Sequence, residues 1–211
     1  WLKNDLSYVS KDKIIFITMH SPVLRRTFHF KQMDHIDELI NIVKGFKQVH
    51  FVTGHIHVNS MEVIAPNIFD HNVGAASGNY WRGKTCKDGT PIGYQVFEIK
   101  GDKVSWYFQS VGQPKDFQFK LYTPADRDAE LNPEKVVVSV WNWDRAWKVE
   151  CSYDGGKSFR AMQRCLDCCD PDAVEEYGTK NKLREPKKPY IFVFYTDHVF
   201  LDVSDPVAKW V

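Results

Sequence analysis

Three histidines lie at positions where imidazole nitrogens could bind a metal ion. His55 and His57 are two residues apart in the motif Gly54-His55-Ile56-His57, and His20 follows an earlier apolar run. Residues two apart in an extended chain project to the same side, so we expect His55 and His57 to face one site. Neutral imidazole suits borderline divalent ions such as zinc, manganese or iron, whereas calcium and magnesium prefer oxygen ligands.

These histidines therefore predict a metal site, which is either a single zinc site or part of a larger cluster. For any one of them taken alone, the alternative is an ordinary histidine packed in the core or in a loop.

The elements before the histidines are typical of a parallel sheet. Ile14-Ile15-Phe16-Ile17 is a continuous apolar run, the pattern of a strand covered on both faces. Asp34 is a candidate N-cap for a helix with its apolar face at positions 36–43, and positions 49–52 form a second short strand. Strand, helix and strand make a βαβ crossover, whose carboxyl ends are the usual place for a ligand site. All three histidines follow such ends.

The pattern changes to β-hairpins further along the chain. A glycine-rich loop at 74–79 is followed by strand-like runs at 94–99 and 104–108, with the turn Lys100-Gly101-Asp102-Lys103 between them. The segment 112–116 has the composition of a linker. We therefore expect a first domain over residues 1–112.

Beyond the linker the sequence predicts an all-β unit over residues 113–211. Its turn signal is Asp154-Gly155-Gly156, and its strand-like runs are 136–141, 147–153, 158–162 and 190–195. Several short runs in under about 100 residues favour a small β-sandwich. The predicted fold class is thus α/β followed by all-β.

Composition excludes several classes of partner. The 211 residues carry 28 Lys+Arg against 27 Asp+Glu, so no basic field attracts nucleic acid or an anionic membrane. No apolar run approaches the roughly 20 residues that a transmembrane helix needs. We expect neither a nucleic-acid nor a membrane partner.

Five cysteines are present, three of them in Cys165-Leu166-Asp167-Cys168-Cys169. A structural zinc site needs four ligands, and no second pair accompanies this one. Free thiols or one local disulfide are the favoured interpretation.

Taken together, these segments resemble the closing half of the calcineurin-like metallophosphoesterase superfamily. The resemblance rests on the helix at 1–9, on Met19-His20-Ser21-Pro22 and on Gly54-His55-Ile56-His57-Val58-Asn59. The stretches 75–81 and 88–94 are similar to bacterial members that append a small C-terminal β domain. The resemblance implies a partial αββα sandwich followed by that β domain.

The resemblance also implies a site. His20 and His55 would bind one divalent metal ion and His57 a second, the ions being manganese, zinc or iron. The substrate would be a phosphate monoester or diester. Asn79 and Trp81 would line the cleft, and Arg25 is a candidate for phosphate contact; core packing is the alternative for Trp81, and an exposed loop for Arg25.

The family's earlier motifs, the series Asp-x-His, Gly-Asp and Gly-Asn-His, do not occur in order before these histidines. Asp70-His71-Asn72 is the segment most similar to these motifs, and it falls after the Gly-His-x-His motif. We therefore expect a C-terminal fragment of a larger enzyme that carries only part of the two-metal centre. Uncovered sheet surface would favour a homodimer, and the resemblance suggests export to a bacterial periplasm or cell envelope.

Two other functions stay open. Trp141, Trp143 and Trp147 lie close together and could form a platform for a glycan or a protein, although burial between sheets is the favoured interpretation. The chain could also be a single-metal, non-catalytic relic of the fold.

Overall fold

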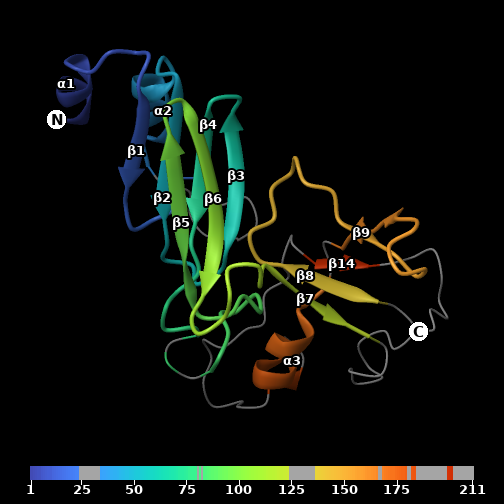
Figure 1. Cartoon of the computed structure of the whole chain (residues 1–211). Helices are drawn as coiled ribbons and strands as arrows, with labels where there is room; N and C mark the ends of the chain where they lie inside the picture. Colours follow the sequence, from blue (N-terminus) through green and yellow to red (C-terminus); the bar gives the residue numbers. More distant parts are fainter. Residues whose placement is uncertain are drawn as a thin grey trace.

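The computed structural model describes residues 1–23, 34–79, 81, 83–123, 136–165, 168–179, 182–183 and 199–201. A short helix, α1 (Leu2–Ser7), precedes a four-stranded sheet of β1 (Ile14–Thr18), β2 (Gln48–Thr53), β3 (Ser60–Ala65) and β4 (Ile68–Asn72) (Figure 1). The strand order is β1-β2-β4-β3. Strands β1, β2 and β4 run parallel, and β3 is antiparallel to β4.

The predicted βαβ crossover is confirmed. Helix α2 (Ile36–Val43) connects β1 to β2, which pair in parallel register. The expected N-cap is wrong by one residue, because His35 occupies that position with a left-handed φ of 61°. Strand β4 was not predicted.

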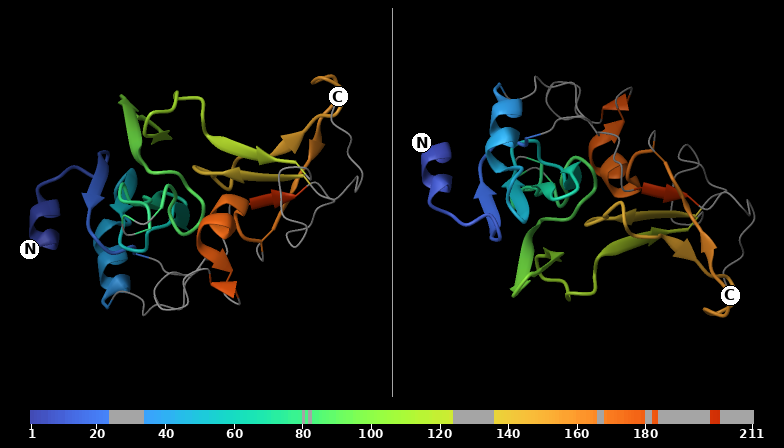
Figure 2. Two further views of the ribbon diagram at one scale, coloured as in Figure 1. Left: turned by 90° about the horizontal axis from the view of Figure 1, so that it is seen from below. Right: turned by 90° about the horizontal axis from the view of Figure 1, so that it is seen from above.

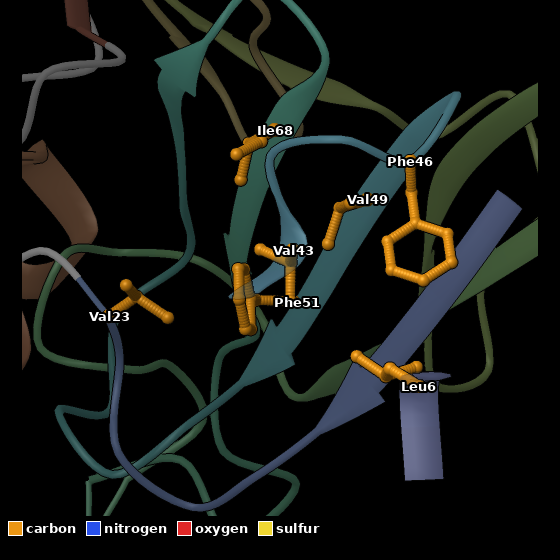
Figure 3. Close-up of a cluster of buried hydrophobic side chains, with 7 residues drawn as sticks. All are labelled: Leu6, Val23, Val43, Phe46, Val49, Phe51 and Ile68. Carbon is orange, nitrogen blue, oxygen red and sulfur yellow. The ribbon is translucent and has the colours of Figure 1, made fainter. Parts of the chain in front are cut away.

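One face of the sheet packs against α2. Alternation along β1 and β2 turns Ile15, Ile17, Val49 and Phe51 toward the helix, where a buried apolar cluster forms (Figure 3). Its buried members are Leu6, Val23, Val43, Phe46, Val49, Phe51 and Ile68. This core accounts for the apolar residues at alternate positions of the two strands.

The other face is covered by the predicted hairpin, β5 (Gly93–Lys100) and β6 (Lys103–Ser110). Figure 2 shows α2 and this hairpin on opposite sides of the sheet. Gly101 takes a φ of 59° at the turn, a conformation that glycine adopts without steric cost. Helix, sheet and hairpin thus stack as three layers.

Two histidines lie in the layer between sheet and hairpin. His50 and His71 are fully buried, and His50 Nδ1 lies 2.9 Å from His71 Nε2. Aromatic rings surround them, namely Phe16, Phe69, Phe97 and Trp106. His50 Nε2 and His71 Nδ1 have no hydrogen-bond partner among the described residues. Burial lowers the pKa of His50 to about 4 and that of His71 to about 3, so both are neutral at pH 7.

A second sheet, with strand order β11-β14-β8-β7, lies in the C-terminal region. Its strands are β7 (Phe119–Tyr122), β8 (Val137–Val140), β11 (Gln163–Arg164) and β14 (Val199–Leu201). The predicted turn at Asp154 joins the antiparallel pair β9 (Glu150–Cys151) and β10 (Arg160–Ala161), and a further pair is β12 (Gly178–Thr179) with β13 (Lys182–Leu183). The run expected at 190–195 lies outside the described residues.

The expectation of an all-β second unit is wrong, because helix α3 (Pro171–Tyr177) lies within it. Asp170 caps this helix: its Oδ1 accepts a hydrogen bond from Ala173 N at 3.0 Å, and Pro171 suits the first helical position. The helix has only seven residues, too few for a periodic apolar pattern to stand out in the sequence. The small β-sandwich and the boundary at 112/113 stay predictions.

The two regions are joined by polar contacts between residues distant in sequence. Arg145 pairs with Glu62 at 3.0 Å, and Asn59 Nδ2 donates to the carbonyl oxygen of Trp141. Glu176 on α3 accepts hydrogen bonds from Lys84 N at 2.7 Å and from Thr85 Oγ1 at 3.1 Å. These contacts brace the loop at 83–90 against α3.

The tryptophans do not form a common platform. Trp141 is 3% exposed and packs on Phe117 with ring centroids 4.5 Å apart. Trp143 packs edge-on against Phe200, and Trp147 is 42% exposed. Burial of Trp141 is confirmed, although it and Trp143 follow β8 instead of lying within a strand.

The local disulfide is confirmed as Cys165–Cys168, with Cα atoms 5.5 Å apart. Cys86, Cys151 and Cys169 are outside the disulfide. In the part of the chain that the structure describes, no helix is long and apolar enough to cross a membrane.

The buried histidine pair predicts a loss of stability in acid. Each histidine has a lower pKa in the folded than in the unfolded chain, so its contribution is fully present above the ordinary value of 6.5 and is lost as pH falls toward 4 or 3. At pH 5 the free energy of unfolding should fall by on the order of 2 kcal/mol for each histidine. Urea titrations between pH 8 and pH 5 measure this. The double variant His50→Leu/His71→Leu should lose most of the pH dependence. If the free energy of unfolding of this variant still falls as much between pH 8 and pH 5, the buried pair is not its cause. His35→Leu, at an exposed histidine, is the control.

Asp170 should be a main determinant of the C-terminal fold. It is fully buried, caps α3 and also accepts hydrogen bonds from Tyr122 Oη and Ser139 Oγ. Asp170→Ala should lower the free energy of unfolding by about 3 kcal/mol, because a cap is lost and buried donors are left unpaired. Asp172→Ala, which removes a half-exposed ion pair with Lys120, should cost less than about 1 kcal/mol. Equal effects in urea denaturation would contradict this role.

Candidate metal site at the carboxyl ends of the parallel strands

His20 and His55 are brought together just beyond the parallel pair β1 and β2. The ladder continues past the strands, since Met19 N donates to Val52 O at 3.1 Å and Gly54 N donates to His20 O at 3.0 Å. His55 Nδ1 then lies 2.9 Å from His20 Nε2, with the rings edge to face. Both side chains are exposed. The predicted meeting of these two histidines at one sheet edge is therefore found.

The Gly-His-x-His motif is not extended as expected. Strand β2 ends at Thr53, and both histidines of the motif have left-handed φ angles, 73° at His55 and 56° at His57. Ile56 N donates to Gly54 O at 2.9 Å, which closes a three-residue turn centred on His55. Such conformations cost of order 1–3 kcal/mol in non-glycine residues, and they cluster at functional sites.

His57 is oriented by the glycine-rich loop. Its Nδ1 lies 3.1 Å from Gly78 O. A carbonyl can only accept, so Nδ1 carries the proton and the lone pair is on Nε2, the tautomer typical of a metal-binding histidine held by a backbone carbonyl. Burial lowers the pKa of His57, helped by the charges of Lys87 and His20, while the bond to Gly78 acts in the opposite direction.

The donor set fits part of a metal centre. Ligand nitrogens at 2.0–2.1 Å from an ion lie about 2.8 to 3.4 Å apart for right-angled to tetrahedral geometry, a range that includes the 2.9 Å hydrogen bond between the rings of His20 and His55. Among the described residues, no three histidine, cysteine, aspartate or glutamate side chains form a group that could hold an ion. These two histidines thus match adjacent coordination positions, and they do not by themselves make a closed site.

Asp70 holds the segments that carry these two histidines. Its buried carboxylate accepts hydrogen bonds from Val23 N at 2.6 Å and from Thr53 Oγ1 at 2.8 Å. Val23 lies three residues after His20, and Thr53 lies two residues before His55. From the sequence, Asp70 could be noted only for its likeness to a family motif, because nothing in the sequence pairs it with position 23.

Asp88 supports the segment that follows the motif. Its carboxylate accepts from Asn59 N at 2.7 Å, from Thr90 N at 3.1 Å and from Thr90 Oγ1 at 3.0 Å. Lys87 N donates to His57 O at 3.3 Å, so the loop at 86–90 contacts the histidine motif directly. The Asp88-Gly89-Thr90 turn could be read from sequence, but its contact with Asn59 could not.

Asn79, one of the expected substrate contacts, is fully buried. Neither polar atom of its side chain has a hydrogen-bond partner among the described residues. Trp81 is 85% exposed, so the core-packing alternative is wrong. Arg25 lies outside the described residues.

Comparison with known proteins gives one match. A family model described as the C terminal of calcineurin-like phosphoesterase matches residues 70–202, more than half of the chain. The matched segment begins after the three histidines. No curated protein and no solved structure matches the chain.

The surroundings of His57 predict how it titrates. Its pKa in the metal-free chain should lie below the ordinary 6.5, because its ring is desolvated and because the ammonium of Lys87 disfavours a second positive charge. Lys87→Met should raise that pKa part of the way back, and Lys87→Arg should leave it low. Histidine ring resonances followed by NMR against pH measure this. A pKa at or above 6.5 in the wild type, or no rise in Lys87→Met, would contradict the described electrostatics.

Proposed function

This chain belongs to the family of C-terminal regions of calcineurin-like phosphoesterases, and from that premise we propose that it is the C-terminal part of a metal-dependent phosphoester hydrolase. The observation that carries the proposal is the pair of nitrogens, His20 Nε2 and His55 Nδ1, held 2.9 Å apart beyond two parallel strands. The family match lies over a different part of the chain, so the two supports are independent.

In this proposal the three histidines are metal ligands. His20 and His55 bind one divalent ion through the nitrogens that face each other, and His57 binds a second ion through Nε2. Manganese, zinc or iron suits imidazole donors. Two such ions, when bound, supply Lewis-acid stabilisation of phosphoryl oxygens and a bound water of lowered pKa.

The chain's own residues position these ligands. The hydrogen bond from His57 Nδ1 to Gly78 O fixes the ring and its tautomer. Asp70 fixes the segments that bear His20 and His55. We propose that Trp81, which belongs to the loop that holds His57, lies beside the alcohol portion of the phosphoester, whereas Asn79 is fully buried within that loop.

The remaining ligands would come from outside this chain. The family's ordered series of Asp-x-His, Gly-Asp and Gly-Asn-His does not occur here before the histidines. We therefore propose that catalysis requires a preceding segment of a longer enzyme. Pairing of two copies and export to a bacterial envelope stay predictions.

Hydrolysis of bis-(4-nitrophenyl) phosphate and 4-nitrophenyl phosphate with added Mn²⁺ tests this function. The gene product extended upstream of Trp1 should turn over at least one of the two esters, and the 211-residue chain alone should be at least 100-fold slower, since it holds only part of a two-metal site. His55→Ala in the longer protein should reduce kcat/KM by a comparable factor, whereas exposed His35→Ala should not change it. Absence of turnover in the longer protein, or full activity of His55→Ala, would overturn the proposal.

A further inference from the structure

Trp81 is a large aromatic side chain that the fold does not use for packing. It is 85% exposed, in contrast to Trp141, which is 3% exposed in the core. An indole left in water gives no stabilisation through burial. Exposure alone does not distinguish Trp81, since Trp1 is 90% exposed, but its location and its backbone conformation do.

The position is close to the candidate metal site. Trp81 N donates to Ser77 O at 2.8 Å, which ties Trp81 to Ser77. Gly78, the residue after Ser77, is the one whose carbonyl oxygen contacts His57 Nδ1 at 3.1 Å. Three residues span at most about 11 Å. The backbone of Trp81 therefore lies no further than that from Gly78, which contacts the ring of His57.

The backbone of Trp81 is also strained. Its φ of 62° is left-handed, a conformation that is a genuine outlier for a bulky residue and costs roughly 1–2 kcal/mol. Glycine at this position would remove the strain and lose nothing from the core. A packing role therefore does not explain a strained, exposed indole next to a ligand site.

We propose that Trp81 is a recognition platform for a planar ring on the phosphoester, so that the substrates are esters of aryl, benzyl or nucleoside type and not small aliphatic or inorganic phosphates. Stacking on an exposed indole suits this use because the ring presents a large apolar face with little loss of side-chain freedom. The inference rests on the proposed phosphoesterase function and adds its substrate class.

Benzyl and ethyl esters of phosphate test the inference, because the two alcohols have similar leaving-group chemistry and differ in the ring. We expect Trp81→Ala in the longer enzyme to lower kcat/KM about fivefold for the benzyl ester, mainly through KM, and to leave the ethyl ester unchanged. Trp81→Phe should restore most of the benzyl preference. Trp147→Ala removes an accessible indole far along the chain and should change neither ester.

Trp81→Gly separates recognition from folding. It should keep or raise the melting temperature while losing the benzyl preference, because glycine relieves the left-handed backbone. A lower melting temperature with equal losses on both esters would make Trp81 a structural residue and overturn the inference. Equal kcat/KM for both esters in the wild type and in Trp81→Ala would also overturn it while leaving the phosphoesterase function intact. Failure of the wild type on both of these esters and on both nitrophenyl esters would refute the function and the inference together.

Discussion

The carboxylate of Asp70 is the constraint on which the candidate site depends. Parallel strands deliver their carboxyl ends to one edge of a sheet, but the segments beyond those ends are free to diverge. Asp70, buried on β4, accepts hydrogen bonds from the segment after His20 and from the last residue of β2. Breaking this double contact would leave a buried charge without its partners, which is expensive in a low-dielectric interior. The position of His20 against His55 is thereby coupled to the folding of the sheet.

A second buried carboxylate, Asp88, extends the same principle to the loops. It ties Asn59 to Thr90, while Asn59 in turn contacts the backbone of Trp141 in the C-terminal region. Glu176 on α3 braces the other end of that loop. The C-terminal region therefore contributes to the site through support of the loop that contacts His57, without supplying a metal ligand in our account. This dependence gives a physical reason for the two regions to occur in one chain.

The parts of the fold that were predictable from sequence are those specified by local pattern. The β1-α2-β2 unit, the β5–β6 hairpin and the turn at Asp154 follow from apolar periodicity and glycine turns. Helix α3 was not predictable because seven residues are too few to show an apolar periodicity. The left-handed turn at His55 was not predictable because no residue type in that segment indicates it. Asp70 contacts residues 17 and 47 positions away, and Asp88 contacts Asn59, 29 positions away; contacts at such separations are properties of the folded chain. His50 was read as part of an apolar strand, and its buried partner His71 could be identified only once β2 and β4 were adjacent.

Metal stoichiometry of the purified 211-residue chain shows whether His20 and His55 form a partial, preformed metal site. After equilibration with Mn²⁺ or Zn²⁺ and removal of free metal, elemental analysis should find no more than one ion per chain. That ion should be lost in His55→Ala and retained in His35→Ala. Two ions per chain, or an ion that survives in His55→Ala, would contradict the account, because the metal would then be held by residues other than this pair.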